Sequence, residues 1–167
     1  MMRRVLSGLL GGAAGCAAMT VFMRRMHRQL PPEDRYALPP RRIAMTMAAK
    51  SGLGPPQREE DRRALTMLAH YAYGTSLGAV YALVAPRTRW APVVGGVPFG
   101  LAVWTGSYLG WLPAMDLHPP ATEESAPRNA LMIASHFVWA GTIAAVVEAT
   151  AEAEGGSSRV FNRTTSY

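Results

Sequence analysis

The sequence predicts an all-α membrane protein with a bundle of four transmembrane helices, because four apolar, glycine-containing stretches fill the chain. At about 1.5 Å of rise per residue, each stretch can cross a hydrocarbon core of roughly 30 Å. A soluble helix of this length would have a polar face, whereas these stretches have charges only at their ends. They occupy residues 5–23, 65–84, 93–112 and 130–147, and none contains Asp, Glu, Lys or Arg.

The first stretch also resembles a secretory signal, because two arginines precede it. However, the residues after Cys16 stay apolar through Met23 and then meet Arg24 and Arg25. This is the pattern at the end of a span, so we expect a retained helix. Cys16 is the single cysteine of the chain, and no internal disulfide can form.

The connections between the stretches differ in length and chemistry. Residues 24–64 form a basic, polar segment with two Pro-Pro steps. Within it, residues 43–51 are amphipathic, and we expect them to form a short helix along the membrane surface. Residues 85–92 make a tight turn, and residues 113–129 form a proline-containing connection.

Composition favours one small domain and a lipid partner. Mean hydropathy is +0.04 over 167 residues, the average of apolar spans and polar connections. The net charge is +6, but the 17 Lys and Arg are spread through the connections. We therefore expect the lipid bilayer as partner, with anionic lipid bound by residues 24–64, and no nucleic acid. The domain covers residues 1–147, and residues 148–167 form a polar, mobile tail.

Charge also predicts an orientation. Four spans place the connections 24–64 and 113–129 on one side, and both termini and the short turn on the other. The first side carries eleven Lys and Arg and the second carries six. Because retained positive charge marks the cytoplasmic side, this favours both termini outside, although the two arginines before the first span favour the reverse.

Glycines repeat at a spacing of four in three of the spans. In lipid, such pairs allow close helix packing, because apolar side chains gain little by leaving the acyl tails. We expect helix packing at these glycines, within the bundle or in a homo-oligomer, although glycine is common in membrane helices anyway. The pairs are Gly8 and Gly12, Gly11 and Gly15, Gly74 and Gly78, Gly96 and Gly100, and Gly106 and Gly110.

The second and fourth stretches resemble each other, which suggests a duplicated two-helix hairpin. At an offset of 66 residues His70 aligns with His136, and aromatic residues align with aromatic residues twice. Such a duplication would relate the two halves by an axis along the membrane normal. The first and third stretches align less well.

The aligned histidines predict a polar site at one end of the bundle. Both lie a few residues inside spans that enter from the same side, below the connection 113–129. Trp104 joins two candidates in a stripe with the spacing of one helix face. Each histidine either binds protons, a metal or a cofactor, or only makes a hydrogen bond between helices. The candidates are His70, His136, Tyr108, Trp111, Asp116, His118, Glu123, Arg128 and Asn129.

Several of these candidates are also explained by purely structural roles. The tryptophans and tyrosines are typical packing and interfacial anchors. Glu123 and Arg128 are placed to cap the fourth helix or to pair at its start. The sequence contains no HExxH, CxxC, GxSxG or phosphate-loop motif. We therefore expect no enzyme activity, no cofactor and no metal.

Residues 107–139 carry the most specific motifs of the chain. They include SYLGWLP at 107–113 and the runs 119–123 and 128–139, and residues 36–41 and 70–74 add to them. These motifs resemble the YagU-like family of small bacterial inner-membrane proteins over most of residues 5–147. The resemblance implies a multi-pass protein of the bacterial inner membrane with uncharacterised activity, loosely associated with acid tolerance. It supplies no established catalytic residues.

The chain departs from this family's pattern in the third connection. In the family, the glutamate that corresponds to Glu123 is often followed by a histidine. This chain has Glu124 at that position. The departure weakens the case for a histidine cluster in this connection.

Three functions fit these observations. The protein binds or passes a proton, an ion or a small solute at the polar end of the bundle. Alternatively, it is an interaction or assembly protein whose glycine faces and basic segment 24–64 contact other membrane proteins or anionic lipid. The third is a haem carrier, because two histidines at one depth on neighbouring helices suit axial ligation of iron.

Overall fold

The computed structural model describes residues 1–52, 54–85, 88 and 92–164, and every regular element in this part is helical. The all-α prediction is therefore confirmed. Short 3-10 and π-helical turns join the α-helices. The α-helices are α1 (Met2–His27), α2 (Pro39–Lys50), α3 (Glu59–Val84), α4 (Val97–Thr105), α5 (Leu112–Ala114) and α6 (Ala126–Thr164).

The four apolar stretches fold as helices of unequal regularity. α1, α3 and α6 contain the first, second and fourth stretches. The third, predicted as one regular span over residues 93–112, is interrupted, because π-helical turns at Pro92–Gly96 and Gly106–Trp111 flank α4. Met2–His27 and Ala126–Ala153 are long and apolar enough to cross a membrane. Crossing by all four stretches stays a prediction.

Three helix ends lie outside the apolar or amphipathic stretches that indicate these helices in the sequence. α2 begins at Pro39 rather than at residue 43, because a proline in the first helical turn forgoes no intrahelical hydrogen bond. α3 begins before its apolar stretch, and its first turn is acidic, which suits the positive end of the helix dipole. α6 runs from Ala126 to Thr164, so residues 148–164, predicted as a mobile tail, are helical.

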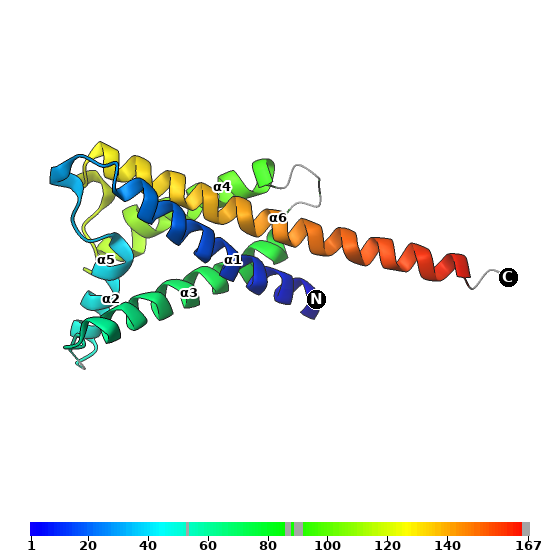
Figure 1. Cartoon of the computed structure of the whole chain (residues 1–167), viewed down its shortest axis with the longest axis horizontal. Helices are drawn as coiled ribbons and strands as arrows, with labels where there is room; N and C mark the ends of the chain where they lie inside the picture. Colours follow the sequence, from blue (N-terminus) through cyan, green and yellow to red (C-terminus); the bar gives the residue numbers. More distant parts are fainter. Residues whose placement is uncertain (53, 86–87, 89–91, 165–167) are drawn as a thin grey trace.

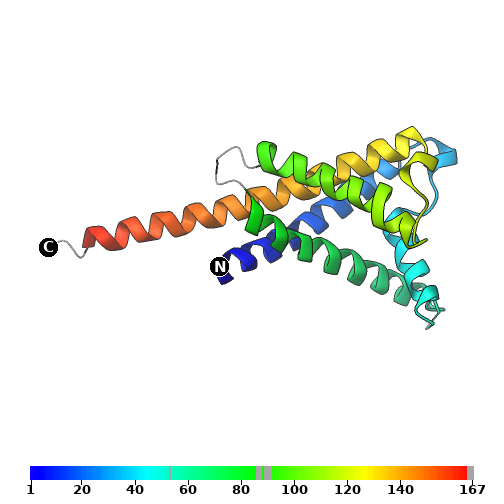
Figure 2. The same cartoon turned by 180° about the vertical axis from the view of Figure 1, so that it is seen from behind.

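α1 lies between α3 and α6 and packs extensively against both (Figure 1). α4 packs on α6, and α2 packs on α3. The view from behind shows α2, α5 and both long connections at one end of the bundle and the N-terminus at the other (Figure 2). This is the placement of the connections that four alternating helices predict. The C-terminal part of α6 extends beyond the other helices.

Glycines bring α1 and α3 into backbone contact. A Cβ atom on Gly8 would lie 2.5 Å from the carbonyl oxygen of Gly78, and one on Gly12 would lie 2.8 Å from the carbonyl oxygen of Gly74. Real side chains do not tolerate such distances, so a larger residue would force the helices apart. The two predicted pairs thus face each other across one helix contact.

Two further pairs bring helices close to α6. A Cβ on Gly15 of α1 would lie 2.8 Å from the carbonyl oxygen of Trp139. One on Gly100 of α4 would lie 2.7 Å from the carbonyl oxygen of His136, and Gly96 meets the next turn of α6. α6 therefore receives α1 and α4 through glycine contacts.

Gly106 and Gly110 do not fit the packing prediction. A Cβ added to either would meet no atom within 4 Å among the described residues. Both lie in the π-helical segment Gly106–Trp111, where Gly110 leaves the helical conformation with φ −116° and ψ −106°. A spacing of four residues no longer corresponds to one helix face there, and the pair does not form a groove.

Candidate functional site

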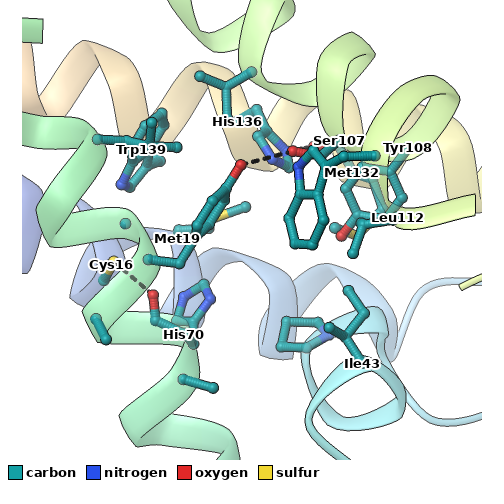
Figure 3. Close-up of a pocket in the computed structure, with 18 of the residues that line it drawn as sticks. Cys16, Met19, Ile43, His70, Ser107, Tyr108, Leu112, Met132, His136 and Trp139 are labelled. Carbon is teal, nitrogen blue, oxygen red and sulfur yellow. Dashed lines mark hydrogen bonds between the residues drawn. The ribbon is translucent and has the colours of Figure 1, made fainter. Parts of the chain in front are cut away.

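A cavity of about 280 Å³ lies between α1, α2, α3, α6, the end of α4 and the segment that follows it (Figure 3). It is at the end of the bundle that carries the long connections. Most of its wall is apolar, with a few polar groups, which is typical of small-molecule sites. The apolar lining includes Met19, Ile43, Met47, Leu77, Val103 and Met132.

His136 is buried, forms part of the cavity wall and makes a hydrogen bond that fixes its tautomer. Its Nδ1 lies 2.8 Å from the carbonyl oxygen of Met132, one turn earlier in α6. A carbonyl oxygen only accepts, so Nδ1 carries the hydrogen and Nε2 of the neutral ring is an acceptor. The ring makes edge contacts with Tyr108 and Trp139, at centroid distances of 5.9 and 6.3 Å.

His70 reaches the same cavity from α3. Its Nε2 is buried and has no hydrogen-bond partner in the described part of the chain. Its carbonyl oxygen lies 3.7 Å from Sγ of Cys16. Figure 3 shows His70 and His136 projecting from α3 and α6 toward the space between the helices. The structure thus brings the two aligned histidines to one cavity.

A hydroxyl pair forms a third polar feature of the wall. The phenolic oxygen of Tyr73 lies 3.0 Å from Oγ of Ser107, and either can be the donor. Ser107 is buried, and Tyr73 also contacts the ring of Trp111 at 5.7 Å. Neither hydroxyl group was among the site residues predicted from the sequence. The position of Ser107 within an apolar stretch could have indicated its role, because serines in such stretches form hydrogen bonds between helices.

The predicted residues beside the cavity form a separate polar cluster centred on Arg128. This side chain is 3 % exposed, and its Nε donates to Oε2 of Glu124 at 2.7 Å. Its Nη atoms donate to the carbonyl oxygens of Asp34 at 2.8 Å and Ala37 at 3.2 Å. The guanidinium also lies 3.6 Å from the ring centroid of Tyr36. Arg128 therefore fastens the first connection to the start of α6.

Glu124 is the acidic centre of this cluster. It accepts hydrogen bonds from the hydroxyl of Tyr36 at 2.5 Å and from Arg42 at 3.2 Å. Burial raises the pKa of its carboxyl, but the hydrogen bonds from Tyr36 and Arg128 more than offset this, and the pKa lies below its ordinary value. Glu124 is thus charged and held in place at neutral pH.

His118 connects the cluster to the cavity wall. Its Nε2 lies 3.8 Å from Glu124, and its ring contacts the edge of Tyr108 at 5.5 Å. Burial lowers the pKa of its imidazole. The ring of Tyr108 contacts both His118 and His136, but His118 does not line the cavity.

The remaining candidates have local roles. Asn129 donates to the carbonyl oxygen of Ala121 at 2.7 Å and so ties the third connection to α6. Asp116 is exposed and lies 3.4 Å from Lys50. Glu123 is exposed as well. The predicted set therefore splits into a cavity group with His70, His136, Tyr108 and Trp111, and residues that fix the connections.

Metal binding finds no support in the described residues. No three His, Cys, Asp or Glu side chains among them come together as ligands. Neither histidine of the cavity is accompanied by a carboxylate in the lining that is described.

A second cavity, of about 260 Å³, lies at the opposite end of the bundle, where Arg3, Arg4 and Glu148 contribute to its wall. The bundle between the two cavities is closely packed. The glycine contacts of α1 with α3 lie in this layer. So do Tyr81, Ala82, Ile143 and Ala144, each at most 1 % exposed.

One family model matches the chain. It is described as a protein of unknown function (DUF1440), and it covers residues 31–145. These residues include α2, α3, α4 and most of the cavity wall. No curated protein and no solved structure matches the chain.

Proposed function

The chain belongs to the DUF1440 family of unknown function, and we propose that it is a multi-pass membrane protein that binds a small solute in the cavity containing His70 and His136. The bacterial inner membrane and the YagU-like family are part of this proposal and rest on the sequence resemblance. The observation that carries it is the largely apolar cavity with a few converging polar groups.

The surface of the bundle supports a membrane location. Large apolar side chains are exposed along α1, α3 and α4, where water would penalise them and lipid would not. α1 and the first 28 residues of α6 have the length and apolar character of spans. The exposed side chains include Leu6, Leu10, Val21, Leu68, Val80, Leu83, Val97 and Leu101.

Binding fits the bundle better than passage. A transport path would have to join the two cavities, and the packed layer of glycine contacts and buried side chains lies between them. Because closely packed helices must separate before a solute can pass, the cavity favours a protein that holds its ligand at one end.

Native mass spectrometry of the protein purified from its host membrane tests this function. We expect wild type to carry a small-molecule adduct and Val103→Phe, which places a larger side chain in the cavity wall, to lose it. Val80→Phe makes the same change at an exposed position of α3 and should keep the adduct. Identical adducts in all three proteins, or none in wild type, would contradict cavity binding.

Exposed arginines favour a second function, the binding of anionic lipid. Arg24, Arg25 and Arg28 are exposed at the end of α1, where acidic headgroups would be attracted. By contrast, Arg42 and Lys50 of the same connection pair with Glu124 and Asp116 and serve to hold it. Replacing the three exposed arginines with glutamine should reduce copurified anionic lipid without affecting the cavity adduct.

The haem alternative has a direct optical test. A Soret band in the purified protein that disappears in both His70→Gln and His136→Gln would favour it over solute binding. The homo-oligomer also stays a prediction, although the pairs at residues 8 and 12, 74 and 78, and 96 and 100 are used within the chain.

A further inference from the structure

We propose that the cavity binds a neutral, lipophilic aromatic hydroxyl compound, of the phenol or quinol class, whose O–H donates to Nε2 of His136. Its hydroxyl oxygen accepts a hydrogen bond from the Tyr73 and Ser107 pair. This inference rests on the proposed function and adds the chemical class of the ligand.

The charge of the ligand follows from the lining. No Asp, Glu, Lys or Arg is among the described residues that line the cavity. A carboxylate, phosphate or ammonium group would enter this apolar space without a counter-ion, which is costly. The ligand is therefore neutral.

The donor on the ligand follows from the tautomer of His136. Nδ1 is the donor to the Met132 carbonyl oxygen at 2.8 Å, so Nε2 presents a lone pair. His136 lines the cavity, and an acceptor there is satisfied by a ligand that carries a hydrogen on oxygen or nitrogen. A ligand with acceptors alone leaves Nε2 unpaired.

The acceptor on the ligand follows from the hydroxyl pair. Tyr73 and Ser107 have two hydroxyl hydrogens, and the hydrogen bond between them at 3.0 Å uses one. The second has no further partner in the described part of the chain. Both residues line the cavity, so this hydrogen is available to a ligand oxygen. A hydroxyl group is the simplest group that donates to His136 and accepts from this pair.

The aromatic character follows from the wall and the volume. Tyr73 and Trp111 contact each other at 5.7 Å, and Tyr108 lies against His136 at 5.9 Å. Such walls favour stacked or edge contacts with a further ring. A dry cavity of about 150 Å³ accepts benzene. The present volume of about 280 Å³ accommodates one ring with short substituents.

The test compares 4-ethylphenol with its methyl ether, 4-ethylanisole, as probes of the full-length protein in lipid nanodiscs. Saturable binding is followed by tryptophan fluorescence and corrected for partitioning into empty nanodiscs. We expect the phenol to bind about tenfold more tightly than the ether, the factor that one net hydrogen bond provides.

Variants assign this preference to the cavity. His136→Phe keeps a ring but removes the acceptor and should abolish the preference. His118→Phe makes the same change at a histidine that also contacts Tyr108 but does not line the cavity, and it should retain the preference. The double variant Tyr73→Phe, Ser107→Ala removes both hydroxyl hydrogens and should weaken the binding of both probes, because the ether oxygen also accepts from this pair. This second test does not depend on the folding of His136→Phe, and unchanged binding of both probes would overturn the proposed contact.

The outcomes separate the ligand class from the function. Equal affinity of wild type for phenol and ether overturns the aromatic hydroxyl class. The aromatic hydroxyl class is also overturned if neither probe binds but wild type carries a copurified adduct that Val103→Phe loses. In that case binding of a solute in the cavity is still supported. Absence of both adduct and probe binding overturns the class and the function together.

Discussion

At the scale of single residues, the contacts of Arg128 could be predicted only in part from the local sequence. Its position near the start of α6 predicts a cap or an ion pair, and it does pair with Glu124 four residues earlier. Its other partners are carbonyl oxygens of Asp34 and Ala37, far away in the chain. Such long-range contacts have no periodicity or spacing in the sequence and could not be predicted.

Replacing Arg128 should destabilise the junction between the first connection and α6. Arg128→Lys keeps the charge but loses the planar fork that reaches four acceptors, so we expect a loss of about 2 kcal/mol in unfolding free energy. Thermal unfolding in detergent measures it. Arg58→Lys changes an arginine that is exposed in its pair with Glu60 and should have no measurable effect. Equal losses in both variants would show that the buried contacts of Arg128 do not stabilise this junction.

Glu124 and His118 predict lower stability in acid. The pKa of Glu124 is below its ordinary value of 4.5 in the fold, so its contribution is present above about pH 4.5 and lost as pH falls through the folded pKa. Burial lowers the pKa of His118 below its ordinary value of 6.5, and the charges of Arg42 and Arg128 lower it further. The unfolded chain therefore takes up this proton first, and stability also falls below about pH 6.5.

The measurement is the melting temperature between pH 8 and pH 3. We expect a decline that starts near pH 6.5 and steepens below pH 4.5, as the two folded-state shifts require. Glu124→Gln should be less stable at neutral pH and should lose the steeper acidic part. An unchanged acidic profile in this variant would show that the carboxyl does not contribute as described.

The cavity residues were only partly accessible from the sequence. His70 and His136 stand out because the second and fourth stretches align. Tyr73 and Ser107 do not, since their relevance depends on how α3 and the segment after α4 are rotated about their axes. Glycine contacts between helices set the rotation of α3, and the π-helical turn at Gly106–Trp111 sets that of the segment after α4. Hydropathy within one helix reveals neither.

At the scale of elements, the π-helical segment Gly106–Trp111 changes which side chains face the cavity. A regular helix predicts Trp104, Tyr108 and Trp111 on one face. In the structure, Ser107, Tyr108 and Trp111 line the cavity, whereas Trp104 stacks on Tyr108 outside it. π-helical insertions are frequent at functional sites because they redirect side chains in this way. The apolar composition of this stretch does not reveal such an insertion.

Glycine packing gives a prediction with an internal control. Gly78→Leu would drive a side chain into the backbone of Gly8 and Gly12, so we expect a loss of at least about 3 kcal/mol or failure to fold. Gly106→Leu has the same chemistry at a helical position with open space, and stability should change little. Melting temperatures in one detergent compare them. Similar losses in both would mean that the α1 and α3 contact is not closely packed.

At the scale of the whole molecule, the sequence predicted the class and the end-to-end arrangement. Alternation of four apolar stretches requires the two long connections to lie at one end, and they do. The helical continuation of α6 to Thr164 was missed, because its polar, Gly- and Ser-containing composition is typical of a tail. The outside location of both termini rests on the charge count alone and stays a prediction.

Proton flux across liposomes tests the closed layer in the middle of the bundle. Because Tyr81, Ala82, Ile143 and Ala144 and the glycine contacts fill the space between the two cavities, we expect wild type to carry no flux above empty liposomes after a pH step. Gramicidin added at the end confirms that the vesicles can report a flux. Wild-type flux that is lost in both His70→Gln and His136→Gln would favour passage over binding. Non-additive loss in the double variant would then show that the two histidines act as one unit in that passage.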